Sequence, residues 1–167
     1  MRGEPAAGTP ERQRATLAEI AKTIARTAWL DALLVVGSLA NGEADALSDI
    51  DLLVIVREGQ FDQAWAAREE VRVTGTLCAW DQRNDNAEVA AHRWLTTDLV
   101  LVEALFATAS SGVRLAEPRD LVAGRSAAPA ELAQRPRIHR SERGRTEPHP
   151  VEAAYDVFKS KVRRICS

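Results

Sequence analysis

Residues 37–56 read GSLANGEADALSDIDLLVIV, and this stretch decides the fold. An apolar run ends at Gly37, and a second apolar run begins around Asp49 and Asp51. Two carboxylates one residue apart at the start of a buried strand are unfavourable unless each has a charged or hydrogen-bonded partner. Side chains at positions i and i+2 of a strand point to the same face. We therefore expect Asp49 and Asp51 to project together and to share a cation.

The bulk composition is that of an ordinary globular protein. The chain has 167 residues, of which 46% are hydrophobic and 28% charged, and this length favours one domain. A net charge of −2 argues against a general nucleic-acid binder, which carries a clear basic excess. No apolar stretch is long enough for a membrane helix, and residues 1–14 lack the apolar core of a signal peptide. We expect a cytoplasmic protein with no membrane partner.

Apolar periodicity predicts alternating helices and strands. Helical spacing is clearest at Leu17, Ile20, Ile24 and Ala28, and short β-branched apolar runs indicate strands. The predicted helices span 11–29, 38–44, 60–72, 87–94 and 151–165. The predicted strands span 33–36, 50–56, 71–80, 99–106 and 113–115, with a polar turn at 81–86. This order predicts an α/β (α+β) fold with a small mixed sheet flanked by helices. The first two strands are joined either by a crossover or by a long hairpin.

Composition also divides the chain into parts. Residues 1–10 are rich in Pro and Gly and are expected to be a disordered leader. The predicted domain spans 11–124, and a Pro- and Arg-rich linker spans 125–150. Residues 151–167 are expected to form a C-terminal helix whose apolar face packs on the domain or across a homodimer.

A resemblance to a known family rests on two short motifs. Gly37-Ser38, followed by Ser48-Asp49-Ile50-Asp51-Leu52, resembles the signature of the DNA polymerase β-type nucleotidyltransferase superfamily. Residues 37–56 as a whole resemble the minimal nucleotidyltransferase group, which also includes antibiotic adenylyltransferases and certain antitoxins. The specific match is confined to this stretch. It implies a nucleotidyltransferase fold and the transfer of a nucleoside monophosphate.

The chemistry of each motif position agrees with that resemblance. Gly37 has no Cβ, so a triphosphate can approach its backbone closely. Ser38 offers a hydroxyl and a backbone N–H to phosphates. Asp49 and Asp51 supply the carboxylate oxygens that Mg²⁺ prefers beside substrate phosphates. In a two-metal arrangement, one Mg²⁺ activates the attacking hydroxyl and the other stabilises the departing pyrophosphate.

The superfamily also implies a third carboxylate on a neighbouring strand, as a metal ligand or a base. Glu103 is the first candidate, because it alone interrupts the apolar run LVLVEALF at 99–106. Asp98 is the second, at the start of the same segment, and Asp81 is the third, in a polar setting that favours an exposed turn. The alternative for Glu103 is a strand acid paired with an arginine.

Three functions are compatible with these features. The first is a metal-dependent enzyme that moves AMP from ATP onto a hydroxyl of a small molecule or a protein. The second is a non-catalytic, antitoxin-like domain that binds nucleotide or protein. The third is an unrelated α/β domain whose aspartates cap turns. A homodimer could complete the acceptor side of the site.

Overall fold

In the computed structural model, the described residues are 10–83, 88–111, 113, 120–124, 150–151 and 154. The chain forms two compact units, Met1–Arg137 and Ile138–Ser167. In the second unit the described residues are helical, at positions where the predicted last helix begins. The predicted leader and linker, and the rest of that helix, lie almost wholly outside the described residues.

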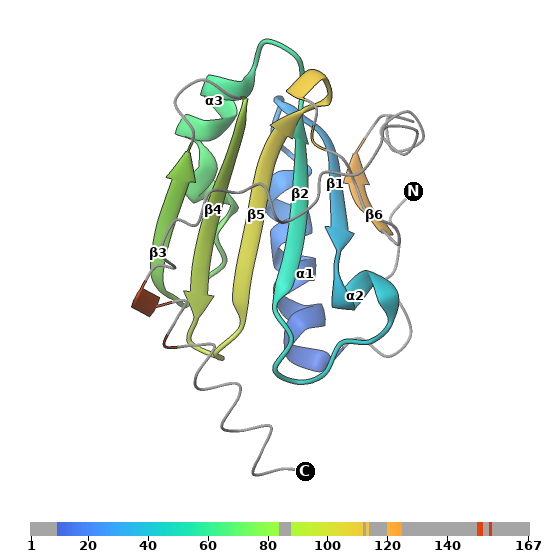
Figure 1. Ribbon diagram of the computed structural model, residues 1–167, viewed down its shortest axis with the longest axis vertical. Coiled ribbons are helices and arrows are strands. Elements are labelled where there is room, and N and C mark those ends of the chain that lie inside the picture. Colours follow the sequence, from blue (N-terminus) through green and yellow to red (C-terminus); the bar gives the residue numbers. More distant parts are fainter. Residues whose placement is uncertain are drawn as a thin grey trace. The chain divides into compact units, whose positions relative to one another are not determined.

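The first unit is built on a six-stranded sheet with the order β3-β4-β5-β2-β1-β6 (Figure 1). Its elements are α1 (Glu11–Ile24), β1 (Leu30–Val36), α2 (Ser38–Asn41), β2 (Ile50–Val56), α3 (Phe61–Ala66), η1 (Arg68–Val71), β3 (Thr76–Arg83), β4 (Val89–Thr96), β5 (Leu101–Thr108), η2 (Ala109–Ser111) and β6 (Asp120–Gly124). Strands β2 and β5 are parallel, and all other neighbours are antiparallel. The predicted mixed sheet flanked by helices is therefore confirmed. The connection left open between the first two strands is a long hairpin that contains α2.

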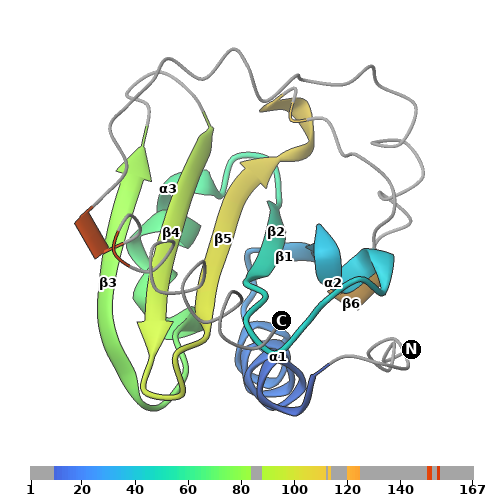
Figure 2. The same cartoon turned by 60° about the horizontal axis from the view of Figure 1, so that its bottom comes forward.

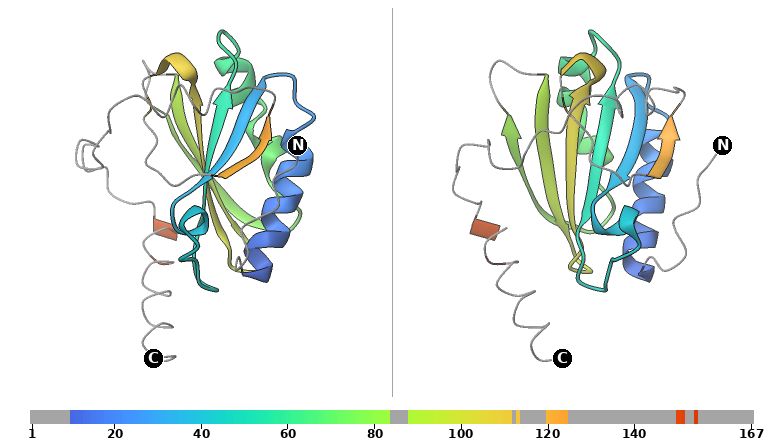
Figure 3. Two further views of the ribbon diagram at one scale, coloured as in Figure 1. Left: turned by 90° about the vertical axis from the view of Figure 1, so that its right-hand side faces the viewer. Right: turned by 45° about the vertical axis from the view of Figure 1, so that its right-hand side comes forward.

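Both main helices cover the same face of the sheet, as Figure 3 shows. Helix α1 lies behind β1 and β2, and α3 lies behind the half formed by β3, β4 and β5 (Figures 1 and 2). The predicted stripe of α1 is buried there through Leu17, Ile20 and Ile24. Burying each such side chain contributes about 1.5–3 kcal/mol. On the α3 side, Trp65 meets Phe106 edge to face, with ring centroids 5.8 Å apart.

Strand alternation gives the sheet a second, less covered face. Ile50, Leu52 and Val54 belong to the large core under the helices, whereas Leu53 and Ile55 belong to a smaller cluster on the opposite face. Asp51 lies in β2 between Ile50 and Leu52, so alternation places it on that opposite face. The face without α1 and α3 is therefore the one that carries the acidic residue of β2.

Within the stretch 87–94, predicted as a helix, residues 89–94 instead form most of β4. This strand lies between β3 and β5, and its burial pattern shows six buried positions among eight. A strand buried on both faces loses the alternation of polar and apolar residues by which strands are recognised. The helical prediction was wrong for that reason.

Other predicted elements are displaced or broken. The helix predicted at 60–72 divides at Ala67 into α3 and η1. The strand predicted at 71–80 begins only after Gly75, which has φ +81°, and it runs on to Arg83 through part of the predicted turn. Val113 is in no strand, and positions 114 and 115 lie outside the described residues. Strand β6 was not predicted.

No helix in the described part of the chain is long and apolar enough to cross a membrane.

Candidate active site

The candidate site is organised by one row of register partners across four strands. Val36 at the end of β1 pairs with Asp51 of β2, and Asp51 pairs with Glu103 of β5. Glu103 in turn pairs with Arg93 of β4. Register partners on neighbouring strands place their side chains on the same face of a sheet. The sheet therefore brings together Asp51 and Glu103, two of the carboxylates that the sequence selected.

Gly37 follows this row directly and is required in two ways. Its backbone has φ +72° and ψ −148°, a region that is open essentially only to glycine. A Cβ at this position would lie 2.5 Å from Oδ2 of Asp51. The first residue of the Gly-Ser motif therefore lets a carboxylate oxygen of the Asp-x-Asp motif lie closer to its backbone than any residue with a Cβ would allow. Ser38 begins α2, whose four residues end at Asn41, with Gly42 as the C-cap.

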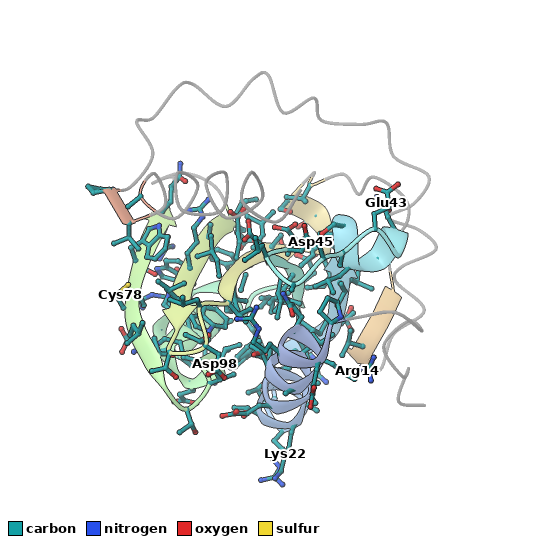
Figure 4. The ribbon with its side chains drawn as sticks, turned by 90° about the horizontal axis from the view of Figure 1, so that it is seen from below. Arg14, Lys22, Glu43, Asp45, Cys78 and Asp98 are labelled. Carbon is teal, nitrogen blue, oxygen red and sulfur yellow. The ribbon has the colours of Figure 1, made fainter. Side chains whose placement is uncertain are left out.

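A hydrogen-bonded turn fixes the chain just before Asp49. The Oδ1 of Asp45 accepts hydrogen bonds from the Leu47 amide and the Ser48 hydroxyl, both at 2.9 Å. The Ser48 Oγ accepts from the Asp45 amide, also at 2.9 Å. Figure 4 shows Asp45 beside α2. The half-buried Asp49 comes next, immediately ahead of β2 and two residues from Asp51.

Glu103 is held by a buried arginine. The Nε of Arg93 donates to Oε2 of Glu103 at 2.7 Å, and its Nη1 donates to Oε1 of Gln82 at 3.2 Å. Arg93 is only 5% exposed. The arginine pairing that the sequence left as the alternative for Glu103 is therefore present. Within the described ranges, no group of three or more His, Cys, Asp or Glu residues could hold a metal ion.

Asp98 is placed differently from the expectation. It lies in the turn between β4 and β5 rather than at the start of a strand, because β5 begins at Leu101. Leu99 in this turn has φ +57°, and its amide donates to the carbonyl of Thr96 at 3.0 Å. The carbonyl of Asp98 accepts from Nη1 of Arg12 at 2.8 Å. Figure 4 shows the labelled Asp98 well away from Asp45.

Asp81 belongs to the other face of the sheet. It pairs with His92, the neighbour of Arg93 on β4, so alternation separates it from Glu103. The predicted exposure of Asp81 is observed, but the predicted turn was wrong, because Asp81 lies within β3. Nη2 and Nε of Arg68 donate to its Oδ2 at 2.8 and 3.0 Å. Asp81 is therefore part of a structural network on the helix side.

The same network shifts two pKa values. Burial by itself would raise the pKa of the Asp81 carboxyl, but hydrogen bonds from Arg68 and His92 outweigh it and hold this pKa below its ordinary value. Burial lowers the pKa of His92, even though its Nδ1 lies 2.6 Å from Oδ1 of Asp81. The neutral imidazole therefore donates from Nδ1 to the carboxylate.

Sequence reasoning missed Arg93 and also two residues at the start of α1, Arg12 and Gln13. Arg93 and Glu103 lie equally far along the chain from Asp98, as the partners of a hairpin centred on that turn do. Recognising a hairpin in place of a helix would have placed this arginine opposite the glutamate. Arg12 and Gln13 carry no signal in the sequence, because their partners are backbone carbonyls distant along the chain.

The donor set suits a divalent cation. Asp49 and Asp51 offer hard carboxylate oxygens, which are the ligands of Mg²⁺. Because Gly37 has no Cβ, Oδ2 of Asp51 can lie close to the backbone of the Gly-Ser turn. In their chemical type, the two carboxylates therefore fit a divalent metal ion.

A mixed sheet with a Gly-Ser turn beside an Asp-x-Asp strand defines a nucleotidyltransferase type of domain. A family model described as nucleotidyltransferase domain matches residues 17–110, which is more than half of the chain, and the chain belongs to this family. The resemblance seen in residues 37–56 is thereby confirmed. No curated protein matches the chain.

Proposed function

We propose that this chain is a metal-dependent transferase that moves a nucleoside monophosphate, AMP from ATP, onto a hydroxyl group of a small molecule or a protein. Membership of the nucleotidyltransferase family supports nucleotidyl transfer in general. The single observation that carries the proposal is the close approach of Asp51 to Gly37, whose missing Cβ would lie 2.5 Å from Oδ2 of this carboxylate. The backbone that would bind phosphate, at Gly37, and the carboxylate that would bind the metal ion, at Asp51, are neighbours there.

The proposed roles follow from these positions. Asp49 and Asp51 would hold Mg²⁺, with two ions as the expected number, and the triphosphate would lie against Gly37 and Ser38. The ions would neutralise phosphate charge and lower the pKa of the attacking hydroxyl. The chain's own contribution is the fixed placement of oxygen ligands and backbone N–H groups, which is the larger part of catalysis in phosphoryl transfer.

Glu103 completes the proposed site as the third carboxylate, either as a metal ligand or as the base toward the acceptor hydroxyl. Its register with Asp51 supports this role, and Asp98 and Asp81 lack that register. Arg93 orients its carboxylate through the 2.7 Å hydrogen bond to Oε2. The acceptor's hydroxyl would then arrive over β5, on the face opposite α1 and α3.

Calorimetric titration with Mg²⁺ and ATP tests the nucleotide site. The double variant Asp49→Asn with Asp51→Asn should abolish metal-dependent ATP binding. Asp62→Asn with Glu69→Gln is the matched control, since it removes two carboxylate charges from exposed positions on α3 and η1. Equal binding by the wild type and the Asp49/Asp51 variant would refute the metal role.

One observation favours a second function, a nucleotide- or protein-binding domain without catalysis, as in an antitoxin. Glu103 is already paired with Arg93, and the described residues contain no group of three metal-binding side chains. Pyrophosphate release with a panel of hydroxyl acceptors separates the two functions. Tight Mg²⁺·ATP binding with no release for any small-molecule or protein acceptor would favour the binding domain.

A further inference from the structure

The first turn of α1 contacts both loops that lead into the acidic strands. Nη2 of Arg12 donates to the carbonyl of Ala46 at 2.8 Å, and its Nη1 donates to the carbonyl of Asp98, also at 2.8 Å. One guanidinium thus joins the turn before β2 to the turn before β5. These two parallel strands carry Asp51 and Glu103.

Gln13 makes the second half of the contact. Its Nε2 lies 3.0 Å from the carbonyl of Ser48, and 3.3 and 3.4 Å from those of Ala46 and Asp45. The carbonyl of Ser48 belongs to the peptide bond that enters Asp49. Gln13 is only 1% exposed, and its Oε1 is buried without a hydrogen-bond partner among the described atoms.

A buried side-chain amide whose oxygen has no hydrogen-bond partner lowers the stability of the folded state. Leaving such a group unpaired costs about 1–3 kcal/mol. Leu17, Ile20 and Ile24 show that the same face of α1 otherwise packs through apolar side chains. Packing alone therefore does not explain why a glutamine is buried at position 13. The hydrogen bonds from its Nε2 to carbonyls of the 45–48 turn do explain it.

We propose that Arg12 and Gln13 are positioning residues that hold the 45–48 turn and the 96–99 turn in one fixed relation, and thereby set the geometry of Asp49, Asp51 and Glu103. This inference rests on the proposed metal and nucleotide site. The two residues touch neither substrate nor metal in this scheme. They act through the backbone carbonyls that precede the acidic strands.

Two variants test the clamp formed by Arg12 and Gln13. Gln13→Leu removes the donors and places an apolar side chain of similar length in a buried position. Arg12→Ala removes the guanidinium, and Lys22→Ala is its matched control, because it removes a positive charge from the exposed side of α1 (Figure 4). Arg12→Lys is the conservative variant, which can donate to one of the two carbonyls but cannot bridge both.

Two measurements are made on each full-length variant. Amide hydrogen exchange without ligand should accelerate at 45–51 in Gln13→Leu and Arg12→Ala, and at 96–99 in Arg12→Ala, and at neither place in Lys22→Ala. The dissociation constant for Mg²⁺·ATP should rise on the order of tenfold, the usual effect of losing an orienting residue behind a metal ligand. Arg12→Lys should lie between the wild type and Arg12→Ala in both measurements.

The outcomes separate the clamp from the proposed function. Unchanged exchange in both loops would overturn the clamp, whatever the nucleotide affinity. Faster exchange with an unchanged dissociation constant, or a lower melting temperature as the only effect, would reduce the two residues to a structural role. A wild-type protein that does not bind Mg²⁺·ATP would overturn the proposed function itself, and with it the positioning role.

Discussion

Asp51 and Glu103 are register partners on β2 and β5, the one parallel pair among the described strands. Parallel neighbours keep directly paired side chains on one face. The two carboxylates therefore share one face although they lie far apart along the chain, with α3, η1, β3 and β4 between them in sequence. Long-range pairing of this kind is what makes the site depend on the whole sheet.

Glu103→Gln should separate binding from transfer. Glutamine keeps an oxygen that can accept the hydrogen bond from Arg93, so the fold should be retained, but the negative charge is lost. We expect the transfer rate to fall by about 10²–10⁴-fold, the usual effect of removing a general base, with little change in the dissociation constant for Mg²⁺·ATP. Single-turnover kinetics and calorimetry measure the two quantities.

Asp81→Asn is the matched control for that change. It also removes one carboxylate charge from the sheet, but on the face that contacts Arg68 and His92. It should lower the free energy of unfolding and leave transfer per folded molecule near that of the wild type. If transfer survived in Glu103→Gln but was lost in Asp81→Asn, the third carboxylate would be Asp81, on the helix side of the sheet. The role given to Glu103 would then be refuted.

Gly37→Ala should damage the nucleotide site beyond its effect on stability. The new Cβ would lie 2.5 Å from Oδ2 of Asp51, in a backbone region that costs non-glycine residues on the order of 1–3 kcal/mol. We expect both a lower free energy of unfolding and at least a tenfold weaker binding of Mg²⁺·ATP, because the carboxylate must move.

Gly42→Ala controls for backbone strain alone. Gly42 has a similar φ of +71°, but a Cβ there would meet nothing within 4 Å. We expect destabilisation on the order of 1–2 kcal/mol, with nucleotide affinity preserved once the protein is folded. Equal loss of affinity in the two variants would mean that contact with Asp51 is not what matters at Gly37.

The extent of sequence-based prediction can be understood from particular elements. Residues 30–56 are a local unit, in which β1, the turn at Gly37, α2 and β2 follow each other, and local patterns predicted both strands. Strand β2 was predicted at its observed bounds, Ile50–Val56. By contrast, β4 is buried on both faces, so its sequence has no alternation that would distinguish a strand from a helix.

The candidate site divides in the same way. Gly37 and Asp51 could be selected from the sequence because their spacing is local. Arg93, Arg12 and Gln13 could not, because each acts through a partner set by tertiary pairing. Because β4 was predicted as a helix, the hairpin that pairs Arg93 with Glu103 was not predicted either.

Arg93→Met should destabilise the protein more than the loss of an exposed ion pair does. The variant leaves the carboxylate of Glu103 without the guanidinium of Arg93, a residue that is only 5% exposed. Because Glu103 itself is partly exposed, we expect a loss of about 1–3 kcal/mol rather than the full penalty of a deeply buried pair. Arg83→Met is the control, since the partner Asp62 is largely exposed and the loss should stay below about 1 kcal/mol. Urea unfolding measures the free energy of unfolding of both variants. Similar losses in the two would show that the burial of Arg93 does not strengthen its ion pair with Glu103.

Acid should destabilise the wild type through His92. Burial lowers the pKa of His92 from its ordinary value of 6.5, so as the pH falls below 6.5 the unfolded chain takes up a proton before the folded one does. The free energy of unfolding should therefore decrease with decreasing pH in this window, by at most about 1.4 kcal/mol per pH unit for one proton. Asp81 contributes a slope of the same sign only at more acidic pH, as the pH approaches its ordinary pKa of 3.8, because the folded protein holds the pKa of this carboxyl below that value. The positive charges of Arg68 and Arg72 act on His92 in the same direction as burial.

His92→Asn isolates this contribution. The amide nitrogen of asparagine can take the place of Nδ1 and donate to Asp81, but it does not titrate. Urea unfolding of both proteins between pH 4.5 and 7.5, a range chosen to span about one unit above and two below the ordinary histidine pKa, gives the slopes. The variant should be less stable at neutral pH, since the smaller side chain leaves a cavity, and its slope below pH 6.5 should be shallower than that of the wild type. Parallel slopes would mean that His92 is protonated alike in the folded and unfolded states, against the effect of its burial.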